Sequence, residues 1–141
     1  MEEKYLTITP AGGRDFMMRK ISGSVVMLNL LRFRDYADYS ETPELAPNHT
    51  ISGEKAYQLY INHTLPYLEK SGGEVLFMGK GGNFLIGPST ERWDAVLLIR
   101  QQSTENFMAF AQDIDYLKGI GHRTAALEDS RLLPLTEDTI K

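Results

Sequence analysis

Hydrophobic residues gather along the chain in blocks that predict a mixed α/β domain. Val25–Leu31 is an almost uninterrupted apolar run, which is typical of a strand covered on both faces, and Trp93–Arg100 has the same character. Between these runs, Ser52 is a suitable cap for a helix over Gly53–Lys70. The apolar side chains of that segment recur at helical spacing, so we expect an amphipathic helix that packs on the sheet.

Weaker signals predict two further elements in the first two-thirds of the chain. Thr9-Pro10 favours a short helix that ends before Gly23. From Glu74 onward, the run EVLFMG, the glycine-rich segment Lys80–Asn83 and the run FLIG predict a hairpin, because glycines allow a tight connection.

The C-terminal third predicts more helix and one further strand. Ser103 can cap a helix whose apolar face includes Phe107 and Phe110, and a second helical piece covers Asp115–Leu127. Arg131–Leu135 is expected to form a short final strand at an edge of the sheet. The order of elements is therefore a helix followed by β-α-β-β-α-β.

This order defines the expected fold class, an α+β, ferredoxin-like βαββαβ domain with an antiparallel sheet. The 141 residues are expected to form one domain. Residues 1–24 are an N-terminal helical extension of it, and residues 32–52 are a long loop inserted after the first strand.

The predicted strands are apolar on both faces, although helices are expected to cover only one face of the sheet. Met27 and Leu31 point to one face, while Leu28 and Leu30 point to the other. A lone domain would leave one apolar face in water. We therefore expect a homodimer that packs through this sheet face.

Composition narrows the classes of function. The chain has 15 basic and 19 acidic residues, for a net charge of −4, which argues against nucleic-acid binding. No apolar stretch approaches the roughly 20 residues that span a bilayer, and the first residues lack a signal-peptide pattern. The absence of cysteine excludes disulfides and thiolate chemistry. We expect a cytoplasmic protein with no nucleic-acid or membrane partner.

Five blocks of the sequence together resemble the longer members of the DUF1330 family, which belongs to the dimeric α/β barrel superfamily. The blocks are VVMLNLLRFRDYADY, SGEKAYQLY, SGGEVLFMGKG, RWDAVLLIRQ and DIDYLKGIGHRTAALEDSRLLPL. The resemblance spans about Thr9 to Leu135. It implies a dimeric α/β barrel with a pocket between sheet and helices in each subunit, but the function of the family is itself unknown. The positions carried over are Asn29, Tyr57, Trp93, Tyr116, Arg123 and Arg131.

Three polar residues at the ends or in the middle of apolar segments are candidates for ligand binding. The amide of Asn29 lies inside an apolar strand, so it needs hydrogen-bond partners from the protein or from a ligand. The guanidinium of Arg123 could hold a substrate carboxylate or pair with an acidic side chain. Arg100 either reaches solvent or closes the mouth of a pocket.

Tyrosines and histidines complete the set of candidate site residues. Tyr57, Tyr60 and Tyr116 could orient a polar ligand through their hydroxyls, and the alternative is that they pack in the core. His63 and His122 are the candidates for proton transfer. The alternatives are a hydrogen-bonded core histidine for His63 and a surface histidine for His122.

No motif in the sequence indicates a metal or a cofactor. The three histidines have no metal-ligand spacing, and the glycines near residue 80 lack the spacing of a phosphate-binding loop. We expect a small organic ligand, bound by a cofactor-independent enzyme of the monooxygenase or isomerase type that the superfamily resemblance implies. The alternatives are a non-catalytic ligand-binding or regulatory homodimer and, third, a haem-degrading monooxygenase analogue.

Overall fold

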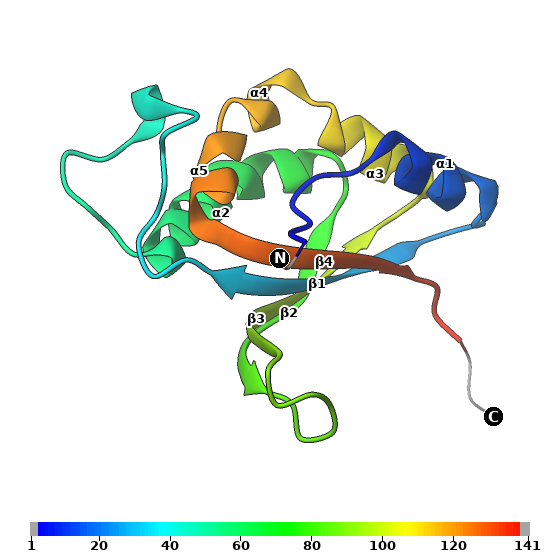
Figure 1. Ribbon diagram of the computed structural model, residues 1–141. Helices are drawn as coiled ribbons and strands as arrows, with labels where there is room; N and C mark the ends of the chain where they lie inside the picture. The colour runs from blue at the N-terminus through cyan, green and yellow to red at the C-terminus, as the bar shows by residue number, and fades with distance from the viewer. Residues whose placement is uncertain (1–2, 139–141) are drawn as a thin grey trace.

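A computed structural model describes residues 3–138 and contains a four-stranded antiparallel sheet (Figure 1). The strand order is β2-β3-β1-β4, so the first and third strands of the unit lie at the centre. This is the ferredoxin-like α+β fold that the order of elements predicts. The strands are β1 (Val25–Phe33), β2 (Glu74–Asn83), β3 (Arg92–Gln101) and β4 (Leu127–Leu135).

The helices lie on one side of the sheet (Figure 1). Ser52 and Ser103 cap α2 and α3 as expected, because each hydroxyl accepts a hydrogen bond from a backbone N–H in the first turn. None of the described helices is long and apolar enough to cross a membrane. The helices are α1 (Pro10–Met18), η1 (Pro43–Leu45), α2 (Gly53–Lys70), α3 (Thr104–Ala111), α4 (Ile114–Leu117) and α5 (Ile120–Ala126).

The hydrophobic core lies between the helices and the sheet. Leu31 of β1 and Leu127 of β4 are completely buried there, and Leu97 of β3 is 4% exposed. Tyr57 and Tyr60 of α2 pack against them. A smaller cluster around Phe16 joins α1 to the first residues of β1, so the N-terminal extension is part of the packed domain.

The predicted turn at Lys80–Asn83 is wrong. These residues continue β2, which pairs with β3 as far as Asn83 opposite Arg92, and the run FLIG lies in the following loop. Gly81 has a different role from the one expected, because a Cβ at this position would collide with the backbone carbonyl of Trp93. The glycine therefore allows two strands to approach closely rather than to turn.

The final strand is longer than the sequence predicts. It begins at Leu127 rather than Arg131, and the preceding helical piece is divided into α4 and α5. Asp129 lies within this strand and is completely buried, which hydropathy does not predict. The residue is held there by Tyr5 and Arg32, which are distant in the chain, and by Arg131 of the same strand.

The face of the sheet opposite the helices carries an apolar row across all four strands. Phe77 of β2 lies opposite Leu98, Leu98 opposite Leu28, and Leu28 opposite Leu133. Phe77 and Leu133 are 54% and 52% exposed. No described element covers this face (Figure 1).

Candidate functional site

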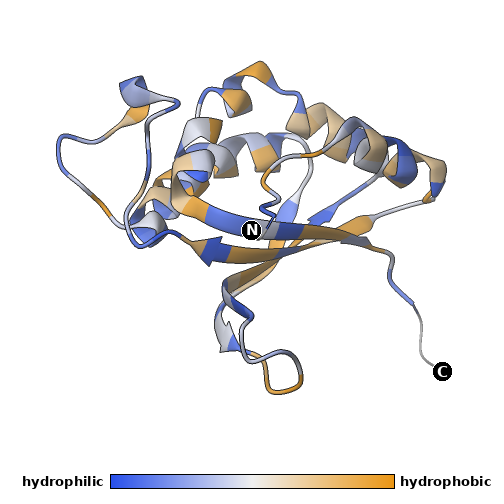
Figure 2. Ribbon diagram, in the orientation of Figure 1, coloured by the Kyte–Doolittle hydropathy of each residue, from blue (hydrophilic) through white to orange (hydrophobic). Residues whose placement is uncertain are grey.

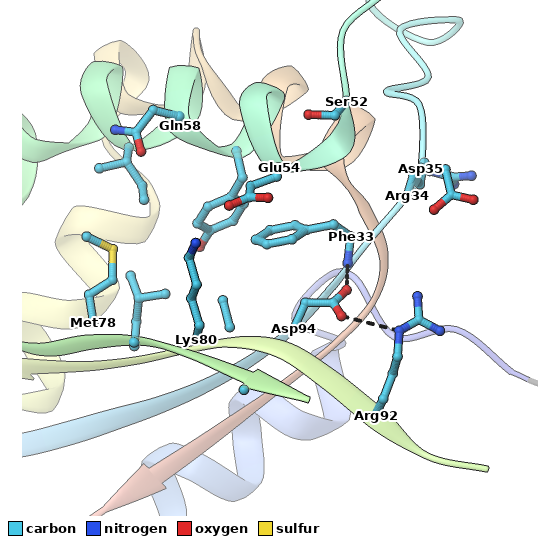
Figure 3. Close-up of a pocket in the computed structure, with 16 residues that line it drawn as sticks. Phe33, Arg34, Asp35, Ser52, Glu54, Gln58, Met78, Lys80, Arg92 and Asp94 are labelled. Atoms are coloured by element: carbon cyan, nitrogen blue, oxygen red, sulfur yellow. Dashed lines mark hydrogen bonds and ion pairs between the residues drawn. The ribbon is translucent and has the colours of Figure 1, made fainter. Parts of the chain in front are cut away.

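A cavity of about 630 Å³ lies between α2 and the sheet, near the end of β1 (Figure 3). Its size is within the usual range of about 300–1,000 Å³ for small-molecule sites. The lining residues come from β1 and the following loop, from the first turns of α2, and from β2 and β3. They are Phe33, Arg34, Asp35, Ser52, Glu54, Tyr57, Gln58, Ile61, Met78, Gly79, Lys80, Gly81, Arg92, Asp94, Ala95 and Leu97.

Gly53 sets the position of α2 over this cavity. Its N–H donates to the carbonyl of Arg34 at 3.0 Å, which ties the start of α2 to the residue after β1. A Cβ at Gly53 would collide with the same carbonyl, and it would lie 2.6 Å from the carbonyl of Ala126. Only glycine allows the helix to begin so close to two backbone segments.

The cavity has an apolar interior and a polar rim. Phe33, Ile61 and Leu97 supply the apolar surface. At the rim, Asp94 accepts a hydrogen bond from the backbone N–H of Phe33 at 2.8 Å and from Nε of Arg92 at 3.2 Å. The bond from Phe33 holds the end of β1 to the start of β3, and the bond from Arg92 lies within β3. The combination of an apolar body and a few polar groups is typical of organic-ligand sites.

Two further charged side chains face each other across the opening. Glu54 points from α2 towards the cavity, and Lys80 points from β2 towards α2 (Figure 3). Both side chains are exposed. Neither forms a hydrogen bond or an ion pair with another residue among 3–138.

Tyr57 is the one residue of the predicted site set that lines this cavity. It is 5% exposed, and burial raises the pKa of its hydroxyl, so the side chain is a neutral phenol at physiological pH. Arg123 lies close enough to oppose part of this shift in the Tyr57 pKa. Tyr57 therefore places a neutral phenol in the lining of the cavity.

Away from the cavity lining lie the other two predicted tyrosines and Arg123. The hydroxyls of Tyr60 and Tyr116 are 2.7 Å apart and share a hydrogen bond in the core. Burial raises the pKa of Tyr116 as well. Arg123 donates to the backbone carbonyl of Leu6 and to the hydroxyl of Ser130, and so attaches the N-terminal segment to β4. These contacts hold the fold together from behind the cavity.

Asn29 and Arg100 lie elsewhere on the sheet. The amide of Asn29 donates to the carbonyl of Met27 at 3.3 Å and to that of Leu97 at 3.5 Å, so it has protein partners. Arg100 forms an exposed ion pair with Glu74. The register places Arg100 opposite Val26, on the face that the helices leave uncovered. Neither side chain lines the cavity.

The two histidines of interest pack among the helices. Nε2 of His63 donates to the carbonyls of Asp115 and Tyr116, at 2.9 and 3.1 Å, and so fixes α4 onto α2. Nδ1 of His122 lies 2.8 Å from the hydroxyl of Tyr39, a residue that lines a second cavity within the loop after β1. Burial, together with the nearby His63, lowers the pKa of His122.

Sequence reasoning missed most of the residues that line the cavity. Glu54 and Lys80 are 26 positions apart and belong to a helix and a strand, so no short motif joins them. Lys80 also lies in the segment that was expected to be a turn. The residues 3–138 contain no group of three or more His, Asp or Glu side chains that could hold a metal ion.

Comparison with solved structures shows first the general class of protein. A dimeric ferredoxin-like protein of unknown function from Jannaschia sp. CCS1 is 11% identical and covers 82% of this chain and all of its own, with a TM-score of 0.52. A Dabb family protein with a ferredoxin-like fold from Mesorhizobium loti is 9% identical, covers 84% of this chain and all of its own, and has a TM-score of 0.51. These likenesses establish the ferredoxin-like fold.

A much stronger likeness shows the family. RPA0582, a protein of unknown function from Rhodopseudomonas palustris, is 31% identical, covers 98% of this chain and all of its own, and has a TM-score of 0.86. The methylated form of RPA0582 is 32% identical over 96% of both chains, with a TM-score of 0.85. The chain belongs to the family of RPA0582. No family model and no curated protein matches it.

Proposed function

We propose that this protein binds a small organic ligand in the cavity between α2 and the sheet. The observation that carries the proposal is the cavity itself, which combines an apolar interior with polar groups at its rim. His63 and His122, the two candidates for proton transfer, do not line the cavity, so the role proposed for it is binding. We assign the protein, within this proposal, to the DUF1330 group of the dimeric α/β barrel superfamily.

A substitution that fills the cavity tests ligand binding. Ala95 lines the cavity from β3, so Ala95→Phe is expected to occupy its interior and to weaken ligand binding at least tenfold. The measurement is ligand-observed NMR with a library of small aromatic and aliphatic acids, amines and alcohols. Ala109→Phe is the matched control, since Ala109 is exposed on α3 and does not line the cavity. Equal binding by the wild type and the Ala95→Phe variant would contradict the proposed site.

We propose in addition that two copies of the chain associate through the uncovered sheet face. The row of apolar residues from Phe77 to Leu133 supports this, because such a surface is costly in water. The hairpin of β2 and β3 projects on the same side and carries an apolar tip (Figure 2). Leu85 and Ile86 in this tip are almost fully exposed. The dimeric state of the Jannaschia protein with the same fold is consistent with this arrangement.

The dimer is expected to dissociate when a charge is placed in the apolar row. Leu98 lies at the centre of the row, so Leu98→Glu would bring like charges close to a two-fold axis and bury them. Size-exclusion chromatography with light scattering should give twice the chain mass for the wild type and a single chain mass for the variant. Leu59→Glu on α2 is the control, and circular dichroism confirms that each variant is folded. A wild-type monomer at micromolar concentration would refute the dimer.

A further inference from the structure

We propose that the ligand of the cavity is a zwitterion with an apolar body, such as an α-amino acid with a hydrophobic side chain. This inference rests on the proposed ligand-binding function and specifies the chemical class of the ligand. It comes from the distribution of charge around an apolar interior, and from two charged groups of opposite sign that have no partner in the protein.

The charges that line the cavity balance. Three of the lining side chains are basic and three are acidic. Arg92 and Asp94 neutralise each other through their hydrogen bond, and Asp94 also accepts from the Phe33 N–H. Arg34 and Asp35 are consecutive and lie together at the end of the cavity near Ser52 (Figure 3). Glu54 and Lys80 form a separate opposed pair at the opening, where α2 faces β2 (Figure 3).

The Glu54 and Lys80 side chains select against a ligand with a single charge. A carboxylate that is attracted to Lys80 is repelled by Glu54, and an ammonium group that is attracted to Glu54 is repelled by Lys80. An α-amino acid carries both groups on one carbon atom, so each can approach the protein charge of opposite sign. Both protein side chains are free to bind it, because neither has a partner among the described residues.

The interior of the cavity determines where the rest of the ligand lies. Phe33, Ile61 and Leu97 form an apolar surface, and Met78 of β2 lies beside Lys80 on the open side. With its charged end between Glu54 and Lys80, a ligand would place its side chain against this surface. Burial of an apolar side chain contributes more binding free energy than an exposed ion pair does. The apolar body therefore supplies affinity, and the two charges supply selectivity.

Four probes that share one aromatic body test the inference. They are L-phenylalanine with both charges, phenylacetate with the carboxylate alone, phenethylamine with the ammonium alone, and 2-phenylethanol with neither. Dissociation constants are measured by NMR titration of the full chain at low ionic strength. We expect L-phenylalanine to bind more tightly than either singly charged probe, by about two- to fivefold, which is the range expected for exposed charges.

Two variants assign this selectivity to the named side chains. The Lys80→Met variant should bind L-phenylalanine about two- to fivefold more weakly than the wild type and phenethylamine more tightly. The Glu54→Gln variant should also bind L-phenylalanine more weakly, and it should bind phenylacetate more tightly. Lys55→Met and Glu69→Gln are matched controls on α2, since both residues are exposed and neither lines the cavity. These controls should leave all four affinities unchanged.

The outcomes separate the two proposals. If phenylacetate, phenethylamine or 2-phenylethanol binds the wild type at least as tightly as L-phenylalanine, and Ala95→Phe abolishes that binding, the zwitterion inference is overturned and the ligand-binding function stands. If L-phenylalanine is preferred but Lys80→Met and Glu54→Gln have no effect, the assignment to this pair is overturned. If none of the four probes binds at millimolar concentration, the zwitterion inference is overturned, and the library screen with Ala95→Phe decides the ligand-binding function separately.

Discussion

Asp129→Asn is expected to lower the free energy of unfolding by about 3–5 kcal/mol, the usual cost of removing one partner from a buried ion pair. The Asp129 carboxylate lies 3.3 Å from Nη2 of Arg32 and 2.8 Å from Nη1 of Arg131. It also accepts hydrogen bonds from the backbone N–H groups of Tyr5 and Ser130. Asparagine has the same shape but no charge, so the ion pair between Asp129 and the buried guanidinium of Arg32 is lost. Urea denaturation at pH 7 measures the effect.

Glu128→Gln is the control for this variant. Glu128 is the neighbour of Asp129, but its side chain is 41% exposed and pairs with Lys4 at the surface. Such a pair contributes at most about 1 kcal/mol. If Asp129→Asn and Glu128→Gln change the unfolding free energy equally, the buried ion pairs of Asp129 do not stabilise the fold more than a surface ion pair does.

The effect of Asp129→Asn should also depend on pH. Burial by itself raises the pKa of Asp129, but the hydrogen bonds from Tyr5, Arg131 and Ser130 outweigh it and hold the pKa below its usual 3.8. A carboxyl group whose pKa is lower in the folded protein stabilises the fold above the unfolded pKa, and this contribution is lost as the pH falls. The difference between wild type and variant should therefore be complete at pH 7 and shrink below about pH 4.

Leu31→Ala is expected to lower the unfolding free energy by about 2–5 kcal/mol, because it leaves a cavity in a close-packed core. Leu31 is completely buried and lies opposite Ala95 of β3 and Ser130 of β4 in the sheet. Its side chain belongs to the same core cluster as the tyrosines of α2. Thermal and urea denaturation measure the loss. The same variant should weaken ligand binding only through its effect on folding, since Leu31 does not line the cavity.

Leu59→Ala provides the comparison for this core substitution. Leu59 lies on α2 and is 38% exposed, so truncation removes less buried surface and leaves a residue with high helix propensity. We expect a change of less than about 1 kcal/mol. A loss for Leu31→Ala as small as the loss for Leu59→Ala would show that the centre of β1 is not the centre of the core.

The architecture was largely predictable from local signals. Ser52 and Ser103 mark the starts of α2 and α3, and the apolar run from Val25 specifies β1. The path of β2 was not predictable, because a glycine-rich segment is typical both of a turn and of a close approach between strands. The contact between Gly81 and the carbonyl of Trp93 distinguishes these alternatives, and it exists only in the folded chain.

The candidate site was much less predictable than the fold. Tyr57 was singled out and lines the cavity, whereas His63 binds the backbone of α4 and Arg123 binds the N-terminal segment. A polar residue in an apolar segment needs a partner, but the sequence does not show whether that partner is a ligand or the protein itself. For His63 and Arg123 the folded chain supplies the partner.

The sequence by itself determined the order of the elements, the caps of α2 and α3, the apolar character of both sheet faces and the exclusion of thiol chemistry. These properties depend on residues close together in the chain, or on composition alone. Only the tertiary structure brought Glu54 of α2 opposite Lys80 of β2 and placed Asp129 between Arg32 and Arg131. The physical reason is that the first grouping arises from packing of α2 on the sheet and the second from the pairing of β1 with β4, and hydrophobic periodicity encodes neither.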